Sequence, residues 1–339
     1  MPPLMELLFD YGLFLAKTLT LLLAFAALLL ILARARGAGG ASSPVRLEVV
    51  DLGARLREQA ARLREATLAG KALRAYRKAE RKRDKARAQE VATRPRLFVI
   101  DFKGDIRASA AAALRAQVSA LLLEARPEDE VLVRLDNAGG MVTEHGLAAS
   151  QLARLRERGI RLTVAVDKVA ASGGYLMACV ADRIIAAPFA VIGSIGVLAE
   201  IPNFHRLLER HGVDFELHTA GEHKRTLTLF GENTEEGRRK LREQLEETHA
   251  LFKRFVADYR PALDLDRVAT GEYWHGARAV ELGLVDAIQT SDDYLLAARD
   301  SHTLLGLRWR ERKAPLERLI EGGRSVLEQG VAHWWRSGG

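Results

Sequence analysis

The 339-residue chain is long enough for one sizeable folded core with additional segments. Hydrophobic residues make up 48% of it, which excludes a chain that is disordered throughout. The net charge of +7 is concentrated in residues 55–90, which contain thirteen Lys or Arg and five Asp or Glu. The remainder is nearly neutral, which argues against a nucleic-acid-binding domain. The single cysteine, Cys179, excludes an intramolecular disulfide, and we expect it to be a small buried residue instead of a nucleophile.

Residues 13–33 are the first predicted element, an apolar stretch in which Lys17 is the only charge. About twenty apolar residues span a bilayer as a helix. A cleaved signal peptide is the alternative, but Glu6 and Asp10 precede the stretch, where a signal peptide carries positive charge. We therefore expect a retained, single-pass membrane anchor after a short N-terminal segment of residues 1–12.

Residues 34–94 are predicted to form a basic helical linker, because they are rich in Ala, Leu, Arg, Lys and Glu and carry a loose apolar stripe. Two roles fit this segment equally: a stalk that lies on anionic lipid head groups, or a solvated spacer. Arg34 and Arg36 directly follow the anchor and would place the rest of the chain on the cytoplasmic side.

Residues 95–300 are predicted to be one α/β domain. Short apolar runs predict buried strands, and helical stretches lie between them; the strands are expected at residues 97–102, 131–135, 162–166 and 183–187, and the helices at 109–125, 143–158 and 174–181. This alternation predicts βαβ units around a mostly parallel sheet.

Several other elements are expected in the second half of the chain. Residues 214–219 are a possible further strand, and residues 234–259 are a long amphipathic helix with Thr234 as its N-cap. Residues 184–201 are apolar, but glycines, a proline and a charge interrupt them, which favours strand–turn–strand over a second membrane span. Residues 301–339 are expected to be a basic tail, in which Trp334 and Trp335 either touch a membrane interface or a partner, or belong to a docked helix.

Three glycine-rich turns follow predicted strands, at residues 136–140, 170–174 and 192–196. Open α/β sheets bind ligands at the carboxyl ends of their strands, and glycine lets a backbone N–H approach a reacting atom closely. Ser172 lies in the second turn, where a nucleophile or, alternatively, a helix N-cap is expected. None of the nine histidines lies in a motif that marks it as the base, whereas a buried lysine can serve instead.

Several motifs in fixed order resemble those of the signal peptide peptidase A family of serine–lysine peptidases. They are ASGGY, ADRIIAAP and GSIGV at residues 171–175, 181–188 and 193–197, and longer stretches at 220–237 and 269–286 resemble one branch of that family, as do residues 11–20. The resemblance implies a crotonase-like or Clp-protease-like α/β fold. It also implies a homo-oligomeric ring, in which a neighbouring chain completes each site.

By this resemblance, Ser172 is the nucleophile and Lys224 is the general base. Ser194 is expected to hydrogen-bond the lysine and orient it. Gly139 and Gly173 are expected to supply the N–H groups of an oxyanion hole. The resemblance implies neither a metal ion nor an organic cofactor.

The chain departs from the family pattern at two places. Residues 137–138 are Asn-Ala where the family commonly has Ser-Pro, and this change puts the role of Gly139 in doubt. His223 precedes Lys224 where the family often has tyrosine. Neighbours in an extended segment point to opposite faces, so His223 need not join Lys224 in the site, although it could tune the lysine.

We therefore expect a membrane-anchored serine endopeptidase that cleaves extended peptides through an acyl-enzyme, with no nucleic-acid partner. Remnant signal peptides and membrane-associated proteins are the substrates that the resemblance implies, at the bacterial inner membrane. Two alternatives remain: a proteolytically inactive membrane scaffold with the same fold, or acyl-CoA or thioester chemistry. The family places the catalytic domain outside the cytoplasm, whereas the arginines after the anchor favour the inside, so the side stays open.

Overall fold

The computed structural model describes residues 4–37, 46–90 and 93–310. The chain divides into two units, of which the smaller comprises residues 1–46 and 309–339 and the larger residues 47–308. The smaller unit contains helix α1 (Leu4–Gly37). Among the helices that the structure describes, none has the length and apolar character needed to cross a membrane.

Two expectations fall partly outside the described residues. The expected membrane anchor at residues 13–33 includes side chains, at residue 26 and from residue 28 onward, that are not among those described. The anchor therefore stays a prediction. Most of the expected basic tail, residues 311–339 with its tryptophans, also lies outside the described part.

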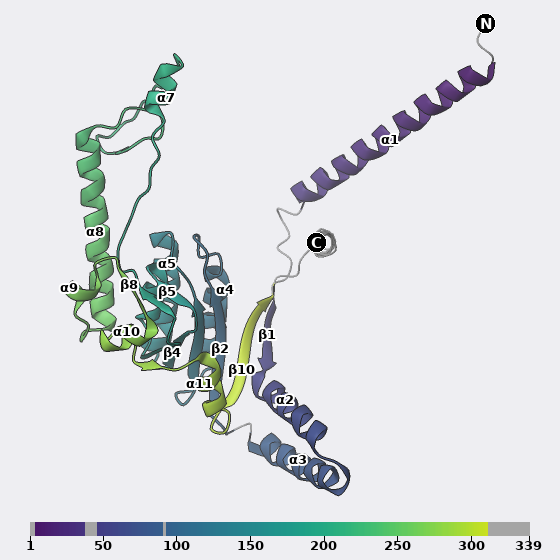
Figure 1. Cartoon of the computed structure of the whole chain (residues 1–339), viewed down its shortest axis with the longest axis vertical. Helices are drawn as coiled ribbons and strands as arrows, with labels where there is room; N and C mark the ends of the chain where they lie inside the picture. The colour runs from purple at the N-terminus through teal and green to yellow at the C-terminus, as the bar shows by residue number, and fades with distance from the viewer. Residues whose placement is uncertain (1–3, 38–45, 91–92, 311–339) are drawn as a thin grey trace, which may run out of the picture. The chain divides into compact units, whose positions relative to one another are not determined.

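The larger unit alternates strands and helices along most of its length (Figure 1). Its helices are α2 (Leu52–Thr67), α3 (Gly70–Glu90), α4 (Ala111–Glu124), α5 (Val142–Glu157), α6 (Gly173–Ala178), α7 (His205–Arg210), α8 (Glu235–Tyr259), α9 (Leu265–Val268), α10 (Gly276–Glu281) and α11 (Ser291–Ala298). Its strands are β1 (Arg46–Asp51), β2 (Arg96–Lys103), β3 (Glu130–Asp136), β4 (Arg161–Val166), β5 (Val169–Ala171), β6 (Arg183–Ala186), β7 (Val191–Gly193), β8 (Tyr273–His275), β9 (Ala287–Ile288) and β10 (Thr303–Arg310), of which β1 and β10 reach the boundary between the units.

The main sheet has seven strands in the order β1-β10-β2-β3-β4-β6-β9. Each strand from β10 to β9 runs parallel to its neighbour. The sheet is buried on both faces, which is why its strands read as continuous apolar runs. One face packs against α4, α5 and α6, and the other packs against α11 and the start of α2. The predicted α/β fold with a mostly parallel sheet is confirmed.

A small second sheet, β5-β7-β8, lies beside the carboxyl ends of the main strands. Strands β5 and β7 are parallel, while β7 and β8 are antiparallel. Asn137, which directly follows β3, forms an isolated parallel bridge with Ala170 of β5. The strand–turn–strand expected within residues 184–201 is therefore β6 and β7, joined by the turn at Pro188.

Helix α8 begins as the sequence predicted, because the Thr234 hydroxyl accepts a hydrogen bond from the N–H of Gly237. Its second half packs into the core through Phe252 and Val256, whereas its first half extends beyond the sheet (Figure 1). The strand expected at residues 214–219 is wrong. This segment pairs with no strand among the described residues, so its backbone has no ladder to join.

Two strands of the main sheet lie outside the expected α/β domain of residues 95–300, and the sequence did not predict them. Strand β1 lies within the expected helical linker, ahead of α2 and α3, and strand β10 lies within the expected tail. Strand β10 inserts between β1 and β2, with Leu305 opposite Phe98. Both segments therefore contribute to the main sheet.

Candidate active site

Ser172 lies at the sharp turn between β5 and α6. Its backbone angles are φ 51° and ψ −121°, a combination that costs a non-glycine residue energy. It occupies the N-cap position of α6, yet its side chain makes no capping hydrogen bond. The turn is fixed by backbone contacts instead: the Ser172 N–H donates to the carbonyl oxygen of Gly193 at 2.7 Å. The strained backbone therefore holds a hydroxyl that does not cap the helix.

Ser194 lies directly beside this turn. Ala171 and Gly193 are paired in the parallel β5–β7 ladder, so Ser172 and Ser194 are the next residues along two adjacent strands. Ser194 also has a positive φ of 50°, and its N–H donates to the carbonyl oxygen of Glu272 at 2.6 Å. The structure thus brings together two of the five site residues expected from the sequence.

The glycine turn after β3 packs tightly against the Ser172 turn. A Cβ atom at Gly139 would lie 2.8 Å from both the Ser172 Cβ and the Gly173 nitrogen, so only glycine fits there. The backbone of Asn137 closes the contact from the other side, since its oxygen accepts the N–H of Ala171 at 3.1 Å. Gly139 and Gly173 are therefore neighbours around Ser172, as an oxyanion hole requires.

The N–H of Gly139 nevertheless has a partner in this structure. It donates to the side-chain oxygen of Asn137 at 2.9 Å. Gly139 can contribute an oxyanion-hole donor only if this hydrogen bond is broken or shared. Gly173, as the first residue of α6, offers an N–H that the helix itself does not use.

Lys224 lies elsewhere in the same chain. It is exposed and lines a surface cavity of about 670 Å³, which is formed by residues of the 217–227 segment and by Gln244. His223 lines the same cavity, whereas Ser172, Ser194 and Gly139 do not. A single chain therefore assembles the serines and glycines of the expected site but does not add the lysine.

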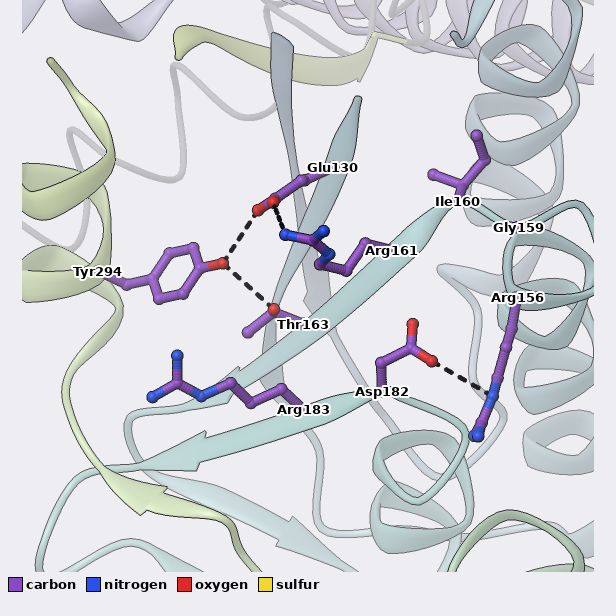
Figure 2. Close-up of a pocket in the computed structure, with 9 residues that line it drawn as sticks. All are labelled: Glu130, Arg156, Gly159, Ile160, Arg161, Thr163, Asp182, Arg183 and Tyr294. Carbon is purple, nitrogen blue, oxygen red and sulfur yellow. Dashed lines mark hydrogen bonds and ion pairs between the residues drawn. The ribbon is translucent and has the colours of Figure 1, made fainter. Parts of the chain in front are cut away.

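A second cavity, of about 580 Å³, lies at the amino ends of the main-sheet strands, whereas the Ser172 turn lies at their carboxyl ends (Figure 2). Glu130, Arg161 and Arg183, the first residues of β3, β4 and β6, line it. Arg161 pairs with Glu130, and the hydroxyl of Tyr294 lies 3.3 Å from a Glu130 oxygen. None of the site residues expected from the sequence lines this cavity. The cavity is therefore separate from the candidate site, and most of the charged side chains that line it are paired with each other.

Cys179 directly follows α6 and is fully buried. Burial raises the pKa of its thiol far above the ordinary value. It is therefore a core residue, as expected, and not a nucleophile. Sequence reasoning did miss two residues of the site, Asn137 and His145. No sequence motif marks His145, but its place in the first turn of the helix that follows the glycine turn is a signal that could have identified it.

A strained serine beside two glycine turns at the carboxyl ends of parallel strands is the arrangement that a hydrolytic enzyme with a serine nucleophile needs. Comparison with known proteins identifies the class as serine peptidases. Residues 6–152 match the model "Peptidase family S49 N-terminal", and residues 154–304 match "Peptidase family S49". The chain therefore belongs to peptidase family S49.

Individual relatives agree with this assignment. The chain is 47% identical over 338 residues to "Probable protease SohB" of Haemophilus influenzae, covering 96% of this chain and 95% of that protein. It is 56% identical over 223 residues to "Probable protease SohB" of Buchnera aphidicola subsp. Acyrthosiphon pisum, covering 66% of each. Among solved structures, the 1510-N membrane-bound stomatin-specific protease in complex with a substrate peptide is similar with a TM-score of 0.43 and 12% identity, covering 67% of this chain and 97% of that one.

Proposed function

We propose that this peptidase cleaves peptide bonds with Ser172 as nucleophile and Lys224 as general base. Ser172 Oγ attacks the carbonyl carbon, its proton passes to the lysine amine, and the resulting ammonium protonates the leaving amine. Water then hydrolyses the acyl-enzyme. The observation that carries this proposal is the Ser172 turn, in which a strained serine with a non-capping hydroxyl lies against Gly139 and beside Ser194.

The proposal requires that Lys224 come from a neighbouring subunit. The segment that carries the lysine has an exposed apolar surface, which is typical of protein interfaces. The apolar side chains of this surface are between 38% and 78% exposed in the single chain. They are Leu198, Ile201, Phe204, Leu207, Val213, Phe215, Leu217, Leu229 and Phe230. A neighbour that covers this surface would also remove Lys224 from water, and a lysine removed from water becomes an uncharged amine that can accept a proton. A ring of identical chains would supply this contact at every site.

A further part of the proposal concerns the membrane. We propose that residues 13–33 anchor the protein in the bacterial inner membrane and that the basic helices α2 and α3 lie near anionic lipids. Membrane-associated peptides, including remnant signal peptides, would then be the substrates within reach. Extraction of membranes with alkaline carbonate tests the anchor, since a spanning helix stays in the pellet. Release of the full chain into the supernatant would overturn it.

The dyad is tested by replacing each member with alanine. Ser172→Ala and Lys224→Ala should each lower the rate of peptide cleavage by at least about a thousandfold, because a nucleophile or its base is removed. Cleavage of a fluorescently labelled casein by the detergent-solubilised full chain measures this. His249→Ala, on α8, is a control that should retain activity. Wild-type rates in either dyad variant would refute the assignment of that residue.

A further inference from the structure

A buried histidine lies directly beneath the residue that follows Ser172. His145, in the first turn of α5, is 0% exposed. A Cβ atom on Gly173 would lie 2.5 Å from the His145 ring carbon Cγ, so the imidazole fills the space that a side chain at 173 would need. The His145 ring therefore packs directly against the backbone at Gly173, next to Ser172.

The same ring contacts the side chain that holds the neighbouring glycine turn. His145 Nε2 lies 3.2 Å from the Oδ1 atom of Asn137, and this oxygen also accepts the N–H of Gly139 at 2.9 Å. The Asn137 amide nitrogen points the other way and donates to the sulfur of Met177 at 3.3 Å. These contacts fix Oδ1 as the atom that faces His145, so Nε2 must carry a proton for the contact to be a hydrogen bond.

Asn137 links the two halves of the candidate site. Its backbone N–H donates to the carbonyl oxygen of Val169 at 2.9 Å, and its backbone oxygen accepts the N–H of Ala171, so it is bonded to β5 on both sides of Ala170. Its side chain is 1% exposed and holds Gly139. A shift of the Asn137 side chain would therefore move Gly139 relative to Ser172 and Gly173.

We propose that His145 is a positioning residue for the peptidase reaction, acting through Asn137 to hold the Gly139 turn against the Ser172–Gly173 peptide. The second nitrogen of the ring, Nδ1, lies 3.0 Å from the carbonyl oxygen of Met141, at the start of α5. A neutral ring has one N–H, so this contact and the contact with Asn137 compete for the same proton. His145 thus connects the helix, the glycine turn and the nucleophile turn. This inference rests on the proposed role of Ser172 as nucleophile.

The first test separates the hydrogen bond from the volume of the ring. His145→Phe keeps an aromatic ring but has no donor, whereas His145→Gln can place an amide N–H near the position of Nε2. We expect His145→Phe to lower kcat at least about tenfold with KM changed less than about twofold, because the Gly139 turn holds the Ser172–Gly173 peptide, and the Gly173 N–H is proposed to support charge that develops in the transition state. His145→Gln should restore kcat to within about threefold of wild type. His249→Phe on α8 is the matched control and should leave kcat unchanged.

The second test asks whether the two residues act together. Asn137→Leu removes the acceptor at similar volume, and Asn137→Asp keeps an acceptor oxygen for both partners. We expect Asn137→Leu to match the loss in His145→Phe, Asn137→Asp to stay near wild type, and the double variant His145→Phe/Asn137→Leu to lose no more than either single variant. Should His145→Phe fail to fold, the comparison of leucine with aspartate at 137 still decides the question.

Three results would overturn the proposal: wild-type kcat in His145→Phe, a loss in His145→Gln as large as in His145→Phe, or additive losses in the double variant. Labelling by a fluorophosphonate separates these results from failure of the proposed function. If wild-type protein is not labelled at Ser172, the nucleophile itself is wrong. If Ser172 is labelled equally fast in wild type and in His145→Phe, only the positioning role is wrong.

Discussion

Two serines in the site, Ser172 and Ser194, hold backbone angles that serine rarely adopts. A positive φ near 50° places Cβ close to the backbone and costs a non-glycine residue about 1–2 kcal/mol. Such strain persists where the surrounding structure fixes the residue, and here the β5–β7 ladder does so. Strain that the fold maintains at two adjacent serines is typical of functional positions.

Replacing Ser194 by glycine or by alanine separates its backbone from its hydroxyl. Both variants lose the hydroxyl that is proposed to orient the lysine, so both should lose peptidase activity to a similar degree. Only glycine relieves the positive φ, so Ser194→Gly should be more stable than Ser194→Ala by about 1 kcal/mol. Thermal or urea unfolding measures the difference. Equal stability of the two variants would show that the backbone is not strained, and full activity in both would exclude a role for the hydroxyl.

The resemblance of short motifs to those of the family predicted the serines and glycines of the candidate site, because each of these residues lies in a motif that is continuous in the sequence. It could not predict where Lys224 lies, since that depends on how a loop far from the sheet meets other surfaces. It also could not assign His145, whose contact with Gly173 depends on the packing of α5 against α6. Asn137 departs from the family pattern in the sequence, but its hydrogen bond to the Gly139 N–H depends on how the turn folds and leaves no signal in the sequence.

At the level of whole elements, two glycines in neighbouring helices differ in the space available for a side chain. Gly146 lies in α5 with no atom within 4 Å of the position of an added Cβ. Gly174 lies in α6, where the same atom would be 2.1 Å from the backbone oxygen of Asn137. The first glycine is therefore replaceable, and the second is required for α6 to approach the turn after β3.

Alanine at these two positions should have opposite effects on stability. Gly146→Ala should stabilise the protein by up to about 1 kcal/mol, because alanine is the better helix former. Gly174→Ala should destabilise it by about 1–3 kcal/mol, since backbone must move to accept the methyl group. Urea denaturation of both variants measures this. A stabilising effect at Gly174 would contradict the packing described for α6.

The start of β2 is held by a buried ion pair. Asp129 is fully buried and accepts hydrogen bonds from the Arg96 side chain and from the N–H groups of Arg96 and Arg126. Burial alone would raise the pKa of Asp129, but these hydrogen bonds outweigh it, and the pKa lies below its ordinary value. The ionised carboxylate is thus the form that the folded chain prefers.

This ion pair predicts how stability depends on pH. A depressed folded-state pKa stabilises the fold above the unfolded value of about 4, and this contribution is lost as the pH falls through the folded-state pKa. Asp129→Asn should therefore be less stable than wild type by about 3 kcal/mol at neutral pH, with the difference shrinking below about pH 4. Urea midpoints between pH 7 and pH 3 measure it, with the exposed Asp214→Asn as control. A difference that does not change with pH would contradict the assignment.

The sequence predicted those elements that show a strong local pattern. The apolar runs of β2, β3, β4 and β6 and the N-cap of α8 follow from neighbouring residues alone. Strand β10 did not, because its partner Arg96–Ile100 lies some two hundred residues earlier, and such a pairing leaves no local signal. The strand predicted at residues 214–219 is wrong because the segment has a local pattern typical of a strand but no neighbouring strand, among the described residues, to pair with.

At the scale of the whole molecule, the position of Lys224 predicts that the active unit contains more than one chain. If the dyad forms between subunits, Ser172→Ala and Lys224→Ala chains should complement each other when they are co-expressed. Random mixing in equal amounts should pair an intact serine with an intact lysine at about a quarter of the contacts and restore about that fraction of activity. Casein cleavage by the co-purified mixture measures it. No recovery above the single variants would place the dyad within one chain.

The insertion of β10 between β1 and β2 has a consequence for how the protein is made. Thr303–Leu307 pair with Arg96–Ile100, so β2 lacks its neighbour on that side until the ribosome has synthesised this late strand. Until then the nascent sheet presents an open, apolar edge, which is a template for aggregation. A chain that terminates before residue 303 should therefore be recognised by chaperones and degraded, even though Ser172, Ser194 and Lys224 have all been translated.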